Sequence, residues 1–295
     1  MEKERQEKGI SFSCSGILDK LDLSRSGYLY YKKTEDELSN RTRRKLEIKT
    51  EIRRIHRKSK EIYGAPKIRA KLIRLGYRIS ERTVSIYMKE MGIKACYIRP
   101  YKVTTTNSNF DQRLKNFLQN NYNPTEPDTI WCSDITYINT EEGFVYLTSI
   151  IDLFSRKIIS WRVSTTLETR WVLECVEEAK AKRKGTNPKI IHSDRGSQYV
   201  SQSYLDLLGE IKASYSDKAS PWQNACIESF HALIKREWLY RFEIRDLGHA
   251  RELIFEYIEA FYNTVRIHSY CGYLSPNDYE EQYQEDLDNL EQRVA

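Results

Sequence analysis

The fold of this chain is set by the stretch Thr129-Ile130-Trp131-Cys132-Ser133-Asp134-Ile135-Thr136-Tyr137. Its β-branched and aromatic residues favour a strand. One acid, Asp134, stands among apolar neighbours, and a carboxylate in a buried strand is costly unless a cation takes up its charge. A second acid, Asp194, ends the apolar run Ile190–Ser193, and a third, Glu228, lies in the first turns of a predicted helix. We interpret the three acids as one site.

The order of elements in this part of the chain predicts the fold class. Period-2 and helical patterns predict strands near residues 131–137, 143–151, 157–163, 189–193 and 211–215, and helices near residues 167–182, 203–208 and 224–240. The order β-β-β-α-β-α-β-α is that of an RNase H-like α/β fold. Its first and fourth strands lie side by side, so their terminal acids are expected to meet.

Basic residues are concentrated ahead of this unit. The chain has 48 Lys and Arg against 42 Asp and Glu, but residues 41–102 hold twenty basic and five acidic residues, a net charge of +15. The remaining 28 basic and 37 acidic residues give −9. Such a split favours a polyanion-binding module beside a differently charged one, against the alternative of a solvated basic surface.

The basic block has the layout of a helix-turn-helix DNA reader. Apolar residues at helical spacing predict three helices, at about residues 44–63, from Pro66 to Gly76 and from Ser80 to Gly92. Arg82, Ser85 and Lys89 are the candidates to face the DNA groove. The alternative is a small helical bundle whose basic face is only surface.

The predicted organisation has five parts: an N-terminal arm (1–40), a basic helix-turn-helix domain (41–104), a linker (105–125), the catalytic core with its C-terminal extension (126–282) and an acidic tail (283–295). In the arm, Ser24 can cap a helix, and a partial helix-turn-helix and a docking arm are left open. No function is assigned to the tail.

The cysteines and the hydropathy indicate where the chain resides. Six cysteines form no Cys-x-x-Cys pair, so a zinc site or a disulfide framework is not expected. The N-terminus lacks the apolar segment of a signal peptide, and no apolar run approaches the roughly 20 residues that span a bilayer. A soluble cytoplasmic protein is expected.

The acids predict metal-dependent phosphoryl chemistry. An all-oxygen pocket suits Mg²⁺ or Mn²⁺, and two such ions about 3.5–4 Å apart can drive an in-line displacement. Asp134 would bridge both ions, while Asp194 and Glu228 would each hold one. Lys235 lies seven residues after Glu228 on the same helical face and is placed to grip a phosphate. Taken singly, each acid has an ordinary alternative: a salt bridge, a turn cap or a surface residue.

Three further side chains are left between two roles each. Arg266 and His268 are candidate DNA contacts, or they pin the C-terminal segment. His231 shares a helical face with Glu228, and a role near the site is rated even with none.

The motifs around these acids resemble bacterial DDE transposases, most of all the B-frame product of the insertion-sequence-three family, which is related to retroviral integrases. They are Trp131-x-x-Asp134-Ile135-Thr136-Tyr137, Asp152-x-x-Ser155-Arg156, His192-Ser193-Asp194-Arg195-Gly196-Ser197-Gln198-Tyr199, Asn224-Ala225-x-x-Glu228-Ser229-Phe230, Tyr262-Asn263-x-x-Arg266-x-His268 and Gly272-Tyr273-x-Ser275-Pro276. The resemblance covers about residues 14–282. Asp194 and Glu228 are separated by 33 residues where the family usually has thirty-five, and residues 218–223 also depart from its pattern.

The resemblance implies a DNA transposase that cleaves at insertion-sequence ends and performs strand transfer, with terminal inverted repeats and target DNA as double-stranded partners. It further implies a homo-oligomer on DNA in a bacterial cytoplasm, associated with the nucleoid, and an A-frame protein or an A–B fusion as partner. One alternative is an RNase H-type nuclease without strand transfer, which the basic region and the Glu228 helix with Lys235 disfavour. The other is a DNA-binding regulator with an inactive core, which the presence of all three acids disfavours.

Overall fold

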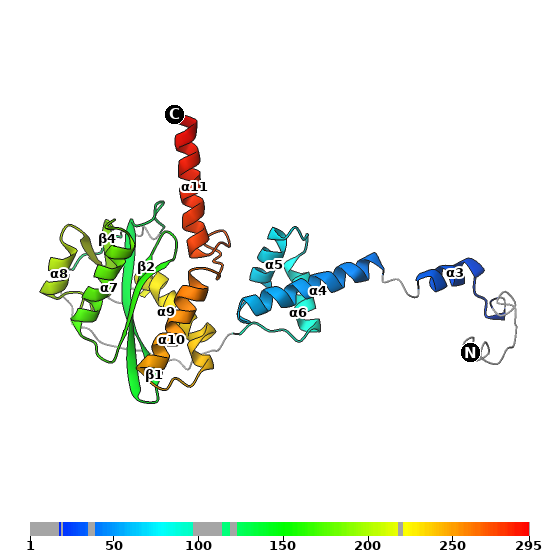
Figure 1. Ribbon diagram of the computed structural model, residues 1–295, viewed down its shortest axis with the longest axis horizontal. Helices are drawn as coiled ribbons and strands as arrows, with labels where there is room; N and C mark the ends of the chain where they lie inside the picture. The colour runs from blue at the N-terminus through cyan, green and yellow to red at the C-terminus, as the bar shows by residue number, and fades with distance from the viewer. Residues whose placement is uncertain are drawn as a thin grey trace.

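The computed structural model describes residues 18, 20–34, 39–96, 114–118, 123–217 and 221–294. The first part of the predicted arm, most of the predicted linker and residues 218–220 before Glu228 therefore lie outside the described residues. Figure 1 shows a sheet flanked by helices, a neighbouring group of three helices, and one long helix that stands away from the sheet and carries the C-terminus.

The sheet has five strands in the order β3-β2-β1-β4-β5. These are β1 (Ile130–Thr140), β2 (Gly143–Asp152), β3 (Ile158–Ser164), β4 (Ile190–Ser193) and β5 (Lys212–Tyr215). The first three form an antiparallel meander, whereas β4 pairs with β1, and β5 with β4, in parallel. The sheet is RNase H-like, and the predicted pairing of the first and fourth strands is confirmed.

Alternate residues of β1 face two hydrophobic layers, as its period-2 pattern requires. Ile130 and Cys132 belong to the layer that includes α9 (Ala225–Glu237) and α10 (Leu247–Tyr257). Trp131 belongs to the opposite layer, with α7 (Thr169–Lys182) and α8 (Gln202–Leu208). The helix predicted for residues 224–240 ends earlier, at Glu237, and a short 3₁₀ turn, η2 (Leu239–Arg241), follows.

The basic block folds as three helices: α4 (Asn40–Lys58), α5 (Ala65–Arg74) and α6 (Glu81–Glu90). Ser80 accepts a hydrogen bond from the backbone N–H of Thr83 and caps α6, as predicted. Gly76 follows α5 with a φ of +88°, a left-handed conformation that glycine adopts without steric cost. Ahead of this group, α3 (Arg25–Thr34) begins beside Ser24, whose hydroxyl accepts from the N–H of Gly27.

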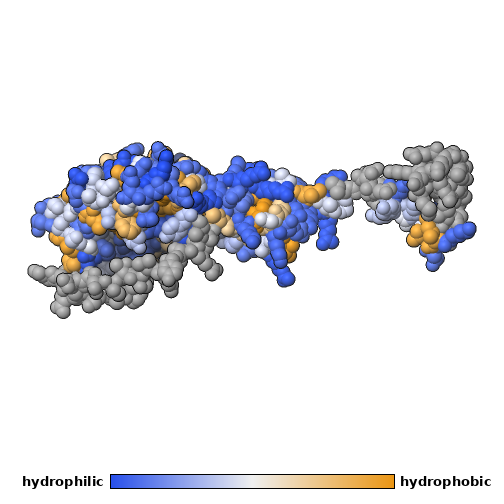
Figure 2. All heavy atoms as spheres, turned by 90° about the horizontal axis from the view of Figure 1, so that it is seen from below, coloured by the Kyte–Doolittle hydropathy of each residue, from blue (hydrophilic) through white to orange (hydrophobic). Residues whose placement is uncertain are grey.

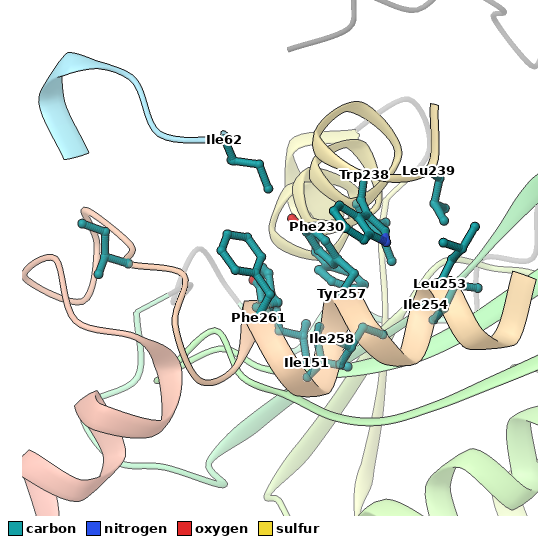
Figure 3. Close-up of a cluster of buried hydrophobic side chains, with 14 of the residues drawn as sticks. Ile62, Ile151, Phe230, Trp238, Leu239, Leu253, Ile254, Tyr257, Ile258 and Phe261 are labelled. Carbon is teal, nitrogen blue, oxygen red and sulfur yellow. The ribbon is translucent and has the colours of Figure 1, made fainter. Parts of the chain in front are cut away.

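The segment that follows α4 contacts the core. The Tyr63 hydroxyl, just after α4, donates to the carbonyl of Val265 at 2.9 Å and accepts from the N–H of Ile267 at 2.8 Å. In Figure 3, Ile62 reaches toward the aromatic side chains of Phe230 and Phe261, and these residues share one buried cluster. The two parts therefore share hydrophobic packing as well as hydrogen bonds.

The acidic C-terminus forms α11 (Pro276–Val294), and its first turns are anchored on the core. Arg183 donates two hydrogen bonds to the carboxylate of Glu280, at 2.9 and 2.6 Å, and Lys157 lies 2.9 Å from the same carboxylate. Beyond this anchor the helix projects away from the sheet (Figure 1). The end of the chain is thus a helix fixed at its base.

Hydrophilic residues cover most of the face in Figure 2, where hydrophobic residues form scattered patches. In the described part of the chain, no helix combines the length and apolar character needed to cross a bilayer.

Candidate active site

The pairing of β1 with β4 brings two of the predicted acids to neighbouring strand ends. Cys132 pairs with His192, and each of the two acids, Asp134 and Asp194, lies two residues further along its own strand direction. Neighbouring strands lie about 4.8 Å apart, so the two acids leave the same edge of the sheet side by side. The Asp194 carboxylate also accepts a hydrogen bond of 2.9 Å from the N–H of Gly196, which orients it.

Glu228 joins the two aspartates from the first turn of α9, the helix that packs on β1. Partial burial, followed by the charges of Asp134 and Asp194, raises the pKa of Glu228. Burial, followed by the charge of Asp134, likewise raises the pKa of Asp194. The three carboxylates therefore repel one another, which is the electrostatic state that a shared cation relieves.

His231 connects Asp134 to the neighbouring strand. Its Nδ1 lies 3.3 Å from Oδ2 of Asp134, and its Nε2 lies 2.7 Å from the hydroxyl of Ser149. A carboxylate only accepts, so a neutral ring that donates from Nδ1 leaves Nε2 to accept the Ser149 hydroxyl proton. Ser149 pairs directly with Asp134 in the sheet. The His231 ring is thus held by Ser149 beside one oxygen of the Asp134 carboxylate.

Lys235 lies in the site beside Thr136 and Tyr137. Its Nζ donates a 2.7 Å hydrogen bond to the hydroxyl of Thr136 and lies 4.7 Å from the ring centroid of Tyr137. Burial lowers the pKa of Lys235, and the charge of Asp134 opposes that shift. A cleft of about 270 Å³ is lined by Asp134, Thr136, Glu228, His231, Ala232, Lys235, Arg236 and Tyr240. The predicted phosphate-binding lysine and two of the acids thus open into one cleft.

The donor set fits a hard divalent cation, because carboxylate oxygens are the ligands that Mg²⁺ and Mn²⁺ prefer. Within the described ranges, no three His, Cys, Asp or Glu side chains already lie close enough together to hold one ion. Binding would therefore require the carboxylates of Asp134, Asp194 and Glu228 to turn toward one another.

The candidate DNA contacts fall into two groups. Arg82, Ser85 and Lys89 are all exposed on α6, where a DNA groove could reach them. By contrast, Arg266 is 4% exposed. Its guanidinium donates to both carboxylate oxygens of Glu237, at 2.7 and 2.6 Å.

The buried position of Arg266 does not fit the predicted DNA contact, because the two guanidinium nitrogens that bind Glu237 are shielded from solvent. His268 lies beside the same guanidinium, with its ring nitrogens 3.3 and 3.4 Å from Nη1 of Arg266. Burial, followed by the charge of Arg266, lowers the pKa of His268. The structure supports the other predicted role of this pair, which is to pin the C-terminal segment.

Comparison with known proteins defines the class to which this site belongs. The family model described as "Integrase core domain" matches residues 124–221, and a second model of the same description matches residues 209–276. A model described as "HTH-like domain" matches residues 43–101. The chain is therefore an integrase-core enzyme that transfers DNA strands, preceded by a helix-turn-helix-like region.

The family follows from two relatives. The transposase InsF for insertion sequence IS3A of Escherichia coli (strain K12) is 31% identical over 271 residues, which cover 91% of this chain and 94% of that protein. The transposase for insertion sequence element IS904 of Lactococcus lactis subsp. lactis is 36% identical over 232 residues, 78% of this chain and 91% of that protein. The chain belongs to the IS3 family of transposases.

Among solved structures, the HTLV-2 integrase catalytic core domain in complex with magnesium is 16% identical, with a TM-score of 0.41. The match covers 53% of this chain and 98% of that one.

Two residues at the site were missed by the sequence analysis, Ser149 and Thr136. Ser149 was identifiable in principle, because a tight turn at residues 141–142 sets the β1–β2 register and pairs it with Asp134. Thr136 lies within the first motif, but its hydrogen bond depends on how far Lys235 reaches, which helical periodicity alone does not give.

Proposed function

We propose that this transposase cuts DNA at the ends of an insertion sequence and joins the freed 3′-hydroxyls to target DNA at the cleft between β1 and α9. The observation that carries the proposal is the placement of Asp134 and Asp194 at adjoining ends of β1 and β4, with Glu228 in the first turn of α9, the helix that packs on β1. An acid whose only role was a salt bridge would not be expected beside two further acids.

Asp134 is proposed to bridge two divalent ions, Mg²⁺ or Mn²⁺, while Asp194 and Glu228 each hold one. When bound, such a pair supplies charge stabilisation to the attacking and leaving oxygens of an in-line displacement. His231, held by its hydrogen bond with Ser149, lies 3.3 Å from the Asp134 carboxylate and is proposed to orient it. Lys235 places a positive charge in the same cleft and is proposed to hold a phosphate beside the scissile bond.

The basic helices are proposed to deliver double-stranded DNA to this cleft. Arg82, Ser85 and Lys89 present exposed side chains on α6, the helix that would enter the major groove. The domain limits are proposed as predicted: 1–40, 41–104, 105–125, 126–282 and 283–295. The partners are proposed to be the terminal inverted repeats, target DNA and further copies of this chain, with an A-frame protein or an A–B fusion completing the assembly.

Cleavage and joining of labelled DNA carrying the element ends test this function. Both reactions should require Mg²⁺ or Mn²⁺, whereas duplex binding by the basic helices should persist in EDTA. Undiminished cleavage in excess EDTA would refute the metal assignment, and cleavage without joining would favour the nuclease alternative.

A further inference from the structure

Exposed aromatic rings border the cleft on the side of Lys235. Tyr137 on β1, Phe144 on β2 and Tyr240 on η2 are 46%, 56% and 45% exposed. The rings of Tyr137 and Phe144 meet edge to face, with centroids 5.4 Å apart. Single exposed aromatic residues are ordinary, but Tyr240 lines the cleft that holds two of the acids, Tyr137 lies against Lys235 of that cleft, and Phe144 packs on Tyr137. We call them the aromatic platform.

The end of the β1–β4 pairing explains how the platform comes so near the acids. That pairing stops at Cys132 and His192, so the following part of β1 has no β4 residue beside it. Tyr137 is an odd number of residues from Asp134, which places the two on opposite faces of the strand. Lys235 nevertheless reaches from α9 to the hydroxyl of Thr136 and to the ring of Tyr137. The Tyr137 ring therefore adjoins the cleft around the free edge of β1.

Tyr240 extends the platform on the other side of Lys235. It lines the same cleft as Asp134 and Glu228. Burial, followed by the charge of Tyr137, raises the pKa of Tyr240, so the two phenols are close enough to interact electrostatically. The cleft thus holds two acids, Lys235 and the ring of Tyr240, and the ring of Tyr137 lies against Lys235.

The chemistry of this surface selects its partner. Exposed aromatic rings combined with a cationic groove are the arrangement by which proteins hold single-stranded nucleic acid, because every base offers a flat π-face and every nucleotide a phosphate. Paired bases inside a duplex present only their edges, so they cannot stack on these rings. The cation of Lys235 matches a phosphate of the same strand.

We propose that the aromatic platform stacks an unpaired base of the DNA strand whose phosphate is held at the acids, so that the chain engages a locally opened DNA end. This inference rests on the proposed DNA-cleaving function.

The contacts of the rings favour stacking. Lys235 and Phe144 hold the ring of Tyr137, so little side-chain freedom remains to be lost when a base binds. Loss of one base–aromatic stack corresponds to about a five- to hundredfold weaker affinity for the opened strand. Affinity for a closed duplex should not change, because the basic helices supply it.

The test measures binding in EDTA, so that no cleavage is needed for the readout. The probes are a short oligonucleotide duplex and the same duplex with three mismatched pairs at one end. The base analogue 2-aminopurine replaces one base in the mismatched end or one base in the paired part of the duplex. The full-length wild type is compared with Tyr137→Leu and Tyr240→Leu, and with the Tyr137→Phe/Tyr240→Phe variant, which keeps both rings. Phe255→Leu, a change at an exposed aromatic residue on α10, is the matched control.

The wild type should bind the opened end more tightly than the closed duplex and quench 2-aminopurine at one of the two labelled positions. Each leucine variant should lose that preference and the quenching, while the phenylalanine variant and Phe255→Leu keep both. Equal affinity of the wild type for the two probes, or leucine variants that retain the preference, would overturn the proposal. Neither result bears on cleavage, which is measured separately with Mg²⁺ on the wild type.

Discussion

Glu237 on α9 and Arg266 in the C-terminal segment form a buried ion pair, and replacing one partner should destabilise the fold. Glu237 Oε2 also accepts a 2.7 Å hydrogen bond from the hydroxyl of Tyr257. Glu237→Gln removes the negative charge and leaves the guanidinium of Arg266, which is 4% exposed, without its counter-charge. Removing one partner of a buried pair costs about 3–5 kcal/mol.

In a chain of this size, each kcal/mol shifts the melting temperature by roughly 2–4 °C. Glu237→Gln should therefore melt about 6–20 °C below the wild type in circular dichroism at pH 7. Replacing both partners with methionine should recover most of the loss, because an apolar pair of similar volume needs no counter-charge.

The pH dependence gives a second check on the same pair. Burial alone would raise the pKa of Glu237, but the hydrogen bonds and charge of Arg266 outweigh it, and the pKa lies below its ordinary value of 4.5. The pair therefore stabilises the fold above about pH 4.5, and this stabilisation is lost as the pH falls through the lowered pKa. Glu237→Gln lacks this contribution and should lose less stability over that acid range.

A Glu237→Gln protein that melts within about 2 °C of the wild type would refute this reasoning. The double methionine variant also separates the two roles predicted for Arg266. If Arg266 pins the C-terminal segment, the refolded double variant binds duplex DNA like the wild type. A large loss of duplex affinity in a stable double variant would instead support the prediction that Arg266 contacts DNA.

Two further predictions concern the metal site and the basic helices. His231→Ala should weaken Mn²⁺ binding about 10- to 100-fold in titration calorimetry, because His231 orients Asp134. His231→Asn should recover part of the lost affinity, and Ser149→Ala should have a smaller effect. Unchanged affinity in His231→Ala would show that His231 has no such role. The affinity for duplex DNA should fall steeply with salt concentration, at a log–log slope of about −0.9 per phosphate contact. Arg82→Ala and Lys89→Ala should each make that slope shallower by about 0.9, the value of one phosphate contact. Slopes equal to that of the wild type in both variants would show that another surface binds the DNA.

The parts of the fold that follow local periodicity were predictable from the sequence. The strand and helix patterns predicted the order of elements along the chain and hence the RNase H-like fold class. In that fold the first and fourth strands are neighbours, so Asp134 and Asp194 were expected to meet. Helical spacing placed Lys235 beside Glu228, since seven residues are close to two turns.

What the sequence could not give were partners brought together by tertiary packing. Glu237 and Arg266 are 29 residues apart on separate elements, and nothing local marks them as a pair. An arginine and a histidine in a motif look like DNA contacts until their burial is known. The end of α9 at Glu237 was missed because the apolar and aromatic residues that follow continue a helical pattern, while the backbone turns at Trp238.

The most direct measurement of the site is strand transfer by a purified Glu228→Gln protein, with Glu252→Gln as the control. Glu252 is exposed on α10, so its change leaves the cleft untouched. Glu228→Gln removes one carboxylate from the three that repel one another, while the helix, the fold and the basic surface remain. Cleavage and joining should both be abolished, with duplex binding and the circular dichroism spectrum unchanged, and Glu252→Gln should match the wild type. A Glu228→Gln protein that still cuts and joins DNA would contradict the assignment of the three acids.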